Sequence, residues 1–144
     1  MPKSRTQFIV AVYLFLLKDN QVLLTRRFNT GYQDGHYSTI AGHLEPGEDI
    51  FSCLSREAYE EAGILIYPEF TQLFHLMTRK TDNHRLDLFF KTSRWQNHPK
   101  ICEPLLCDHL DWFDPNQLPS NTIPYIKKVI QTLKKDNLTY TTLT

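Results

Sequence analysis

The pattern of hydrophobic and polar positions begins with a continuous apolar run. Residues 7–17 are rich in β-branched and aromatic side chains, which favours a buried central strand. A polar turn at 18–21 and a second apolar run at 22–25 complete a predicted β-hairpin. The first run is too short to cross a bilayer, and no small-residue cleavage site follows it, so we expect neither a membrane span nor a secretory signal.

The pattern changes to helical spacing after Pro46 and Gly47. Apolar residues then recur at intervals of three and four, at Phe51, Leu54, Ala58 and Ala62. This spacing predicts a helix from residue 48 or 49 to 62, with one face towards the core. Acids at its start and a glycine directly after its end are typical of helix termini.

The rest of the chain alternates between short apolar runs and polar turns. Strands are predicted at 37–40, 64–66, 70–79, 86–92 and 110–113, with loops at 29–37, 80–85 and 95–104. From residue 124 the apolar positions 126, 129, 130 and 133 predict a second amphipathic helix, and residues 138–144 are expected to be a frayed tail. The sum predicts one α+β domain over residues 1–144, an α/β/α sandwich with a mixed β-sheet between helices.

Charge and cysteine content narrow the class of protein. The 16 basic and 16 acidic residues balance to zero net charge, which argues against a nucleic-acid polymer as partner but not against a nucleotide. The three cysteines have neither zinc-site spacing nor the even number of a disulfide framework, so we expect a reducing, cytoplasmic compartment. Nothing in the sequence decides between a monomer and a homodimer.

An acidic cluster in the first helix carries the candidate chemistry. Glu57, Glu60 and Glu61 have the spacing i, i+3, i+4, so they share one helical face beside the apolar stripe. Because like charges repel, a hard divalent cation is a natural partner, and Mg²⁺ or Mn²⁺ suits oxygen ligands best. Arg56 lies four residues before Glu60 and can pair with it, while Glu48 at the helix start suits a supporting role.

The spacing of these residues resembles the Nudix box. The pattern is Gly42, five residues, Glu48, seven residues, Arg56-Glu57-Ala58, one residue, Glu60-Glu61, one residue, Gly63-Ile64. The resemblance implies a Nudix-type fold and Mg²⁺-dependent hydrolysis of a nucleoside diphosphate linked to another moiety. It implies that Glu57 and Glu61 are the main metal ligands, with Glu60 and the backbone carbonyl of Gly42 beside them. The alternative is a solvated acidic helix face.

Residues outside the box extend the resemblance to MutT-type members. Arg26-Arg27 resembles a twin arginine whose second member contacts substrate, so Arg27 is either a substrate contact or an exposed arginine. The stretch 118–121 resembles one in which an asparagine reads a purine, and Asn121 either does so or caps the second helix. His43 replaces the second glycine of the usual lead-in and is either a phosphate contact or a turn residue.

The general base and the aromatic contact are less defined. Many members carry a further glutamate before the last strand, and here Glu103 and Asp108 are the candidates for a base or an extra ligand. Aromatic residues that can stack on a nucleobase are Phe28, Tyr32, Phe74, Phe89 and Trp112, although most are expected in the core.

The sequence therefore predicts a MutT-like pyrophosphohydrolase that cleaves a nucleoside triphosphate, such as an oxidised purine nucleotide, to a monophosphate and pyrophosphate. ADP-ribose, a dinucleoside polyphosphate or a pterin triphosphate remain alternative substrates. A Nudix-fold module that senses a nucleotide without cleaving it is the alternative from another class, although such a module is expected to have lost box carboxylates.

Overall fold

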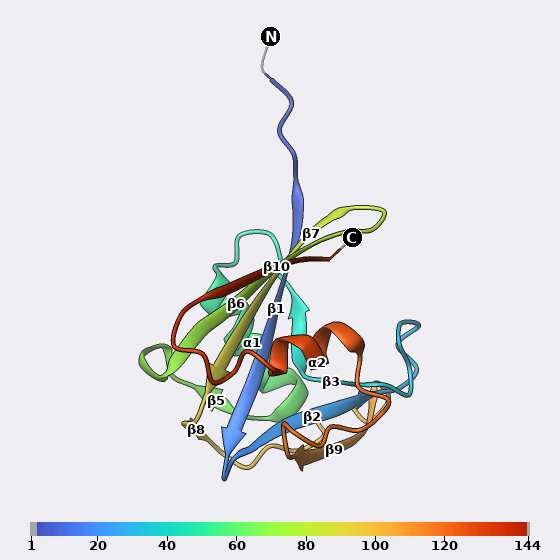
Figure 1. Ribbon diagram of the computed structural model, residues 1–144, viewed down its shortest axis with the longest axis vertical. Helices are drawn as coiled ribbons and strands as arrows, with labels where there is room; N and C mark the ends of the chain where they lie inside the picture. Colours follow the sequence, from blue (N-terminus) through green and yellow to red (C-terminus); the bar gives the residue numbers. More distant parts are fainter. Residues whose placement is uncertain (1–2, 144) are drawn as a thin grey trace.

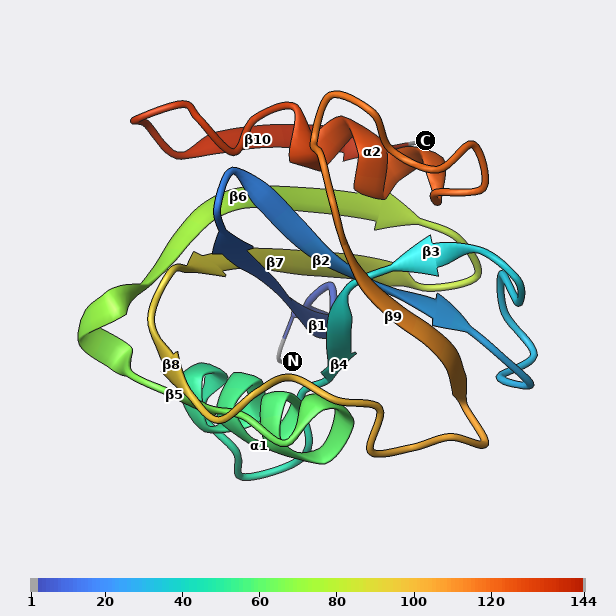
Figure 2. The ribbon, with the colours of Figure 1, turned by 90° about the horizontal axis from the view of Figure 1, so that it is seen from below.

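The computed structural model describes residues 3–143 and shows a twisted mixed β-sheet between two helices (Figure 1; Figure 2). The eight-stranded sheet has the order β10-β6-β7-β1-β2-β3, while β4 also pairs with β1 and β9 with β2. A separate pair is formed by β5 (Leu65–Ile66) and β8 (Trp95–Gln96), so the predicted loop at 95–104 begins with a short strand. The predicted α+β sandwich with a mixed sheet between helices is confirmed.

The predicted central strand is β1 (Phe8–Lys18), which contacts three other strands. It runs parallel to β7 (His84–Thr92) and antiparallel to β4 (Ile40–His43) and β2 (Gln21–Arg27). Its side chains alternate between two buried clusters, which explains the continuous apolar run. Ala11, Tyr13 and Phe15 belong to the cluster that contains the second helix, and Val12, Leu14 and Leu16 to the one that contains the first.

The other strands extend the sheet on both sides of this centre. β2 pairs with β3 (Tyr37–Ser38) and with β9 (Cys107–Phe113), and β7 pairs with β6 (Thr71–Lys80). A short 3₁₀ turn, η1 (Pro68–Phe70), precedes β6. The strands predicted from apolar runs are therefore present, with boundaries displaced by a few residues.

The first helix, α1 (Ile50–Ala62), begins slightly later than predicted because Asp49 is its N-cap. The Asp49 carboxylate accepts a hydrogen bond from the backbone N–H of Ser52 at 2.8 Å, which satisfies a donor that the helix leaves open. Gly63 adopts the left-handed conformation at φ 71° and ends the helix, as predicted. Leu54 and Ala58 are fully buried against the sheet.

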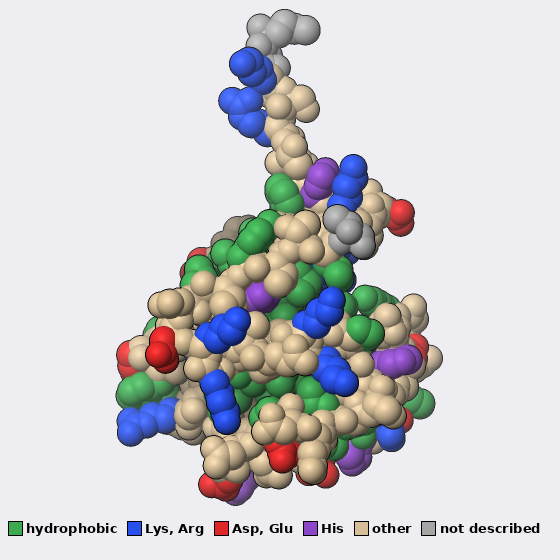
Figure 3. All heavy atoms as spheres, in the orientation of Figure 1, with side chains coloured by type: hydrophobic (Ala, Val, Ile, Leu, Met, Phe, Trp, Pro, Cys, Tyr) green, Lys and Arg blue, Asp and Glu red, His purple; other side chains and the backbone are tan. Residues whose placement is uncertain are grey.

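The second helix, α2 (Pro124–Ile130), is short and covers the opposite face of the sheet (Figure 2). Its buried residues are Ile126, Val129 and Ile130, as its spacing predicted. Lys and Arg side chains lie over the face that α2 covers (Figure 3). Within the described residues, no helix is both long and apolar enough to cross a membrane.

The predicted frayed tail is wrong for most of its length. Residues Thr139–Leu143 form β10, which pairs in parallel with β6 from His75 to Arg79. The ring nitrogens of His75 lie 2.5 Å from the hydroxyl of Thr139 and 2.9 Å from that of Thr141, so hydroxyls that the sequence presents as polar tail residues hold the strand in place. Residue 144 lies outside the described residues.

Candidate metal and diphosphate site

The acidic face of α1 packs against β4 at a glycine. A Cβ atom on Gly42 would overlap the carboxyl group of Glu57, so glycine at this position lets that carboxyl lie directly against the strand. Gly42 itself is held in register opposite Val12 of the central strand. The sequence therefore places a carboxylate of the helix directly against the backbone of the sheet.

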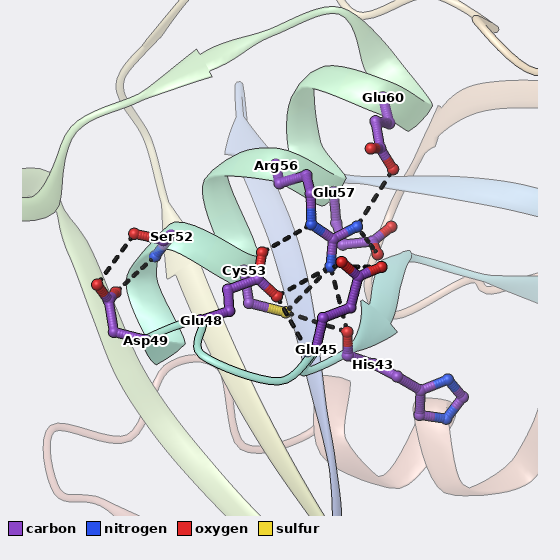
Figure 4. Close-up of polar contacts among 9 residues, drawn as sticks. All are labelled: His43, Glu45, Glu48, Asp49, Ser52, Cys53, Arg56, Glu57 and Glu60. Atoms are coloured by element: carbon purple, nitrogen blue, oxygen red, sulfur yellow. Dashed lines mark hydrogen bonds and ion pairs between the residues drawn. The ribbon is translucent and has the colours of Figure 1, made fainter.

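Arg56 organises the acids around it (Figure 4). Its Nε donates to Glu48 at 2.7 Å, its Nη1 to Glu57 at 2.8 Å, and the same Nη1 to Glu60 at 3.3 Å. Its Nη2 donates to the backbone carbonyl of His43 at 3.2 Å, which ties the helix to β4. The predicted pairing with Glu60 is present, but it is the longest of the three, and Glu48 and Glu57 are the closer partners.

Glu48 supports Arg56 and does not face the other acids. Its two carboxylate oxygens accept from Nε and Nη2 of Arg56, and one of them also accepts the backbone N–H of Glu45. These hydrogen bonds, the one from Arg56 first, lower the pKa of Glu48 to about 2. Glu48 therefore stays ionised and holds the guanidinium in place.

Glu57 and Glu61 form a close carboxyl pair. Burial is the main cause that raises the pKa of both groups, and the negative charge of Glu57 raises that of Glu61 further. The backbone N–H of Ala41, which precedes Gly42 in β4, donates to Glu61 at 3.1 Å. Repulsion between two buried carboxylates is reduced either by a proton that they share or by a bound cation.

The residues fit a divalent cation that keeps part of its own shell of oxygen ligands. Within residues 3–143, no group of three or more His, Cys, Asp or Glu side chains is arranged to hold a metal ion by itself, and Glu60 is half exposed and bonded to Arg56. Mg²⁺ is usually held by one or two carboxylates together with waters and substrate phosphates, so the Glu57–Glu61 pair is a sufficient protein contribution. Softer ions are not favoured, because the pair offers only oxygen.

A cavity of about 520 Å³ opens on the other side of Gly42. Its wall includes Arg27, Gly42, His43, Arg79, Arg85 and Tyr125. A larger hollow of about 1000 Å³ beside the turn between β1 and β2 holds none of the acids of the box. The cavity at Gly42 is also lined by none of these acids, but it reaches the glycine against which Glu57 packs, so it is the candidate place for the rest of a substrate.

The structure places two of the three predicted substrate contacts in the wall of this cavity. Arg27 donates from Nε to the carbonyl of Tyr32 at 2.6 Å, and its guanidinium lies over the ring of that tyrosine. His43 ends β4, and its Nε2 lies 2.8 Å from Nη2 of Arg85. Burial, and next the charge of Arg85, lower the pKa of His43. His43 is part of a strand, so the alternative that it is a turn residue is wrong.

Asn121 is not brought to the cavity wall with the other two. Its side-chain amide donates to the carbonyl of Gly35 at 2.8 Å, and its own carbonyl accepts from the N–H of Tyr37. The alternative that it caps the second helix is wrong, because Ile123 is the N-cap. Its role in reading a purine stays a prediction.

The two candidates for the general base occupy different surroundings. The negative charge of Glu103 contributes to the raised pKa of Glu61, so the two carboxyl groups are near one another. Asp108 is instead paired with Arg26 at 2.8 Å, at a half-exposed position. Glu103 is therefore the better placed of the two.

Most of the aromatic candidates are core residues, as expected. Phe74 and Phe89 are buried, and Trp112 stacks on Trp95. Phe28 and Tyr32 are exposed, and Tyr32 contributes to the cavity wall.

The sequence reasoning missed the charged residues that β6 and β7 contribute to the cavity. Arg79 donates to the fully buried Asp87 at 2.6 Å, lies 4.6 Å from the ring centre of Tyr125, and reaches Tyr13. One signal was present, because Asp87 interrupts an apolar strand and a buried charge is normally paired. Its partner is eight residues away across a strand pair, which the pattern alone does not show.

An acidic helix held against a glycine of a mixed sheet, beside a cavity lined with arginines, defines a class of hydrolases that act on phosphate anhydrides. The NUDIX domain family matches residues 7–133. The chain therefore belongs to the Nudix hydrolases, which act on nucleotide-containing substrates with the help of a divalent metal. The predicted family, fold and enzyme class are confirmed.

Several curated relatives match a part of this chain. The NAD-capped RNA hydrolase NudC of Stutzerimonas stutzeri is 36% identical over 58 residues, which is 40% of this chain and 20% of that protein. The NudC of Vibrio parahaemolyticus is 45% identical over 47 residues, 33% of this chain and 17% of the relative. The chain thus spans about a fifth of these relatives' length.

Solved structures of MutT-type proteins share the whole fold. A MutT NUDIX hydrolase from Burkholderia pseudomallei superposes with a TM-score of 0.81 at 19% identity and covers 89% of this chain and 99% of its own. A mutator MutT protein from Bacillus halodurans gives 0.76 at 20% identity, with 95% and 91% covered. At this level of identity the likeness concerns the fold alone.

Proposed function

We propose that this protein is a Mg²⁺-dependent pyrophosphohydrolase that cleaves the diphosphate linkage of a nucleoside triphosphate or related nucleotide to a monophosphate and pyrophosphate. The observation that carries the proposal is the Glu57–Glu61 pair at Gly42, which adjoins a cavity lined with arginines. A carboxylate pair for the cation and arginines for phosphate are the two parts that such a reaction requires.

Each residue of the box has a defined part in this proposal. Glu57 and Glu61 hold the cation, with Glu60 and the carbonyl of Gly42 able to join them. Arg56 keeps Glu57 in position and Glu48 fixes Arg56, through the hydrogen bonds at 2.8 and 2.7 Å. Bound Mg²⁺, or Mn²⁺ in its place, supplies neutralisation of phosphate charge and a more acidic water.

The remaining residues act on the water and the substrate. Glu103, near Glu61, accepts the proton of the attacking water. Arg27 and His43, both in the cavity wall, contact phosphate, and Asn121 reads a purine from the neighbouring loop. The three cysteines are free, which suits the proposed cytoplasmic location.

A direct test incubates the protein with Mg²⁺ and a panel of nucleotides and identifies the products. The panel contains purine triphosphates with oxidised and normal bases, ADP-ribose, a dinucleoside polyphosphate and a pterin triphosphate. Formation of pyrophosphate and a monophosphate supports the proposal. Binding without turnover of any member contradicts it and indicates a sensing module.

A second candidate follows from the curated relatives. The NudC proteins that match a part of this chain are named hydrolases of NAD-capped RNA. If this chain acts likewise, the same panel extended with NAD and a NAD-capped oligonucleotide yields nicotinamide mononucleotide and a 5′-monophosphate end. That result would also overturn the prediction that no nucleic-acid polymer is a partner.

A further inference from the structure

The cavity beside Gly42 carries more positive than negative charge. Three arginines, Arg27, Arg79 and Arg85, contribute to its wall. Arg79 is neutralised by the buried Asp87, whereas Arg27 and Arg85 have no acid within 4.0 Å among residues 3–143. Arg27 is linked to the carboxylate of Asp34 through the hydroxyl of Thr30, at 3.0 and 2.6 Å, whereas Arg85 faces this space without such an acid.

Arg85 is the more unusual of the two. Its Nη2 is fixed by the ring of His43 at 2.8 Å, and its Nε is buried without a hydrogen-bond acceptor in the described part of the chain. A partly buried guanidinium with an unsatisfied donor is unfavourable unless something else compensates its charge. An anion in the cavity would supply that compensation.

Two of the three tyrosines that line the cavity carry a guanidinium group on one ring face. The guanidinium of Arg79 lies 4.6 Å from the ring centre of Tyr125, and that of Arg27 lies 5.4 Å from the ring centre of Tyr32. One face of each ring is thus occupied by a guanidinium group, and both guanidinium groups contribute to the cavity wall. Such groups match phosphate oxygens in geometry and charge, so the wall favours a phosphate over a nucleobase.

We propose that Arg85 is a specificity-determining residue, which together with Arg27 binds a phosphate group directly beyond the scissile diphosphate. This deepens the proposed function and rests on it. Substrates with at least three consecutive phosphates fill the subsite, whereas the sugar of ADP-ribose or of a dinucleotide leaves Arg85 without its anion. His43, besides its proposed contact with phosphate, holds Arg85 in position through the contact at 2.8 Å.

Steady-state kinetics test the choice of substrate. In Arg85→Gln, KM for a nucleoside triphosphate is expected to rise about 10- to 100-fold, the effect of losing charge-assisted hydrogen bonds, while kcat is unchanged. KM for ADP-ribose changes less than about threefold, because the lost group does not touch it. Arg85→Lys keeps the positive charge but lacks the paired N–H donors of a guanidinium group, so its KM for the triphosphate is expected to lie between those of the wild type and Arg85→Gln. Arg94→Gln removes an exposed arginine that packs on Phe70, and it leaves both substrates unaffected.

Binding of inorganic triphosphate without metal tests the subsite apart from turnover. The N–H resonance of Arg85 Nε is expected to shift on titration, and calorimetry is expected to show binding that Arg85→Gln weakens at least about tenfold. If the wild-type protein hydrolyses no nucleotide, the proposed function fails and this titration alone decides the subsite. An equal rise in KM for all substrates, or an Arg85 resonance that responds to a nucleoside but not to triphosphate, overturns the inference.

Discussion

The acid cluster and the arginine-lined cavity meet at Gly42, but they are assembled in opposite ways. The acids come from α1 and the turn directly before it, and all of them lie within residues 48–61. The arginines come from β2, β6 and the start of β7, from positions 27 to 85. The part that holds a cation is therefore local in sequence, whereas the part that meets the substrate exists only after the strands have paired.

The largest expected effect comes from a variant in the wall of the arginine-lined cavity. Arg79→Met leaves Asp87, which is 0% exposed, without its partner. Removing one member of a buried ion pair is expected to lower the free energy of unfolding by about 3–5 kcal/mol. Urea denaturation of the metal-free protein measures the change.

Two variants control this result. Arg79→Met combined with Asp87→Leu removes both charges and is expected to recover most of the loss. Arg26→Met breaks a pair whose side chains are 34% and 35% exposed, so it is expected to change the free energy of unfolding far less than Arg79→Met does. Equal losses in Arg79→Met and Arg26→Met would contradict the buried pairing.

The next largest effect is expected from Glu57→Gln in the acid cluster. This variant removes a proposed metal ligand while it keeps the shape of the side chain, so turnover with Mg²⁺ is expected to fall at least about 10²-fold for every substrate. Circular dichroism is expected to show an unchanged fold. Near-normal turnover would refute the metal assignment, and a loss confined to one substrate would move Glu57 to the substrate side.

Gly42→Ala tests the point at which the two parts meet. The added Cβ displaces the Glu57 carboxyl that it would overlap, and a misplaced ligand is expected to lower kcat about 10-fold or more. In the background of Glu57→Asp, whose side chain is shorter, the same glycine change is expected to have little further effect. A full additional loss in the double variant would show that Gly42 acts otherwise than by making room for Glu57.

The smallest expected effect is on stability and comes from His75, which lies outside the acid cluster and the arginine-lined cavity. Burial lowers the pKa of His75 below its ordinary value of 6.5, so the unfolded chain takes up a proton at higher pH than the folded one. The free energy of unfolding should therefore fall as pH drops below 6.5, by less than about 1.4 kcal/mol per pH unit, and level off once folded His75 is protonated. The difference between wild type and His75→Gln isolates this slope, and exposed His98→Gln is expected to retain it. A slope that persists in His75→Gln would contradict the assignment.

The sequence predicted correctly those features that depend on a single helix or strand. α1, its glycine end and the central strand follow from periodicity and from local backbone preferences, which need no distant contact. Arg56 was expected to pair with Glu60 by helical spacing, but its closest partner is Glu48, eight residues away, because the turn before the helix folds back.

The sequence did not predict the contacts that depend on which strands pair and in which register. Arg79 and Asp87 come together through the β6–β7 register, and Arg85 meets His43 across 42 residues. The tail was expected to fray because the ends of a chain commonly do, yet two of its threonines contact His75 once β10 has docked on β6. Register is a property of the assembled sheet, so no local pattern contains it.

The docking of β10 also affects how the protein behaves among its own copies. β6 places Phe74 and Met77 in the core and would present a row of unsatisfied backbone groups if nothing lay beside it. Thr139–Leu143 covers that row with a short, threonine-rich strand, which is a poor template for further strand addition. A shortened chain without these residues would keep the acid cluster and the arginine-lined cavity but would expose the edge of β6. Such a chain is expected to aggregate before it loses catalytic activity.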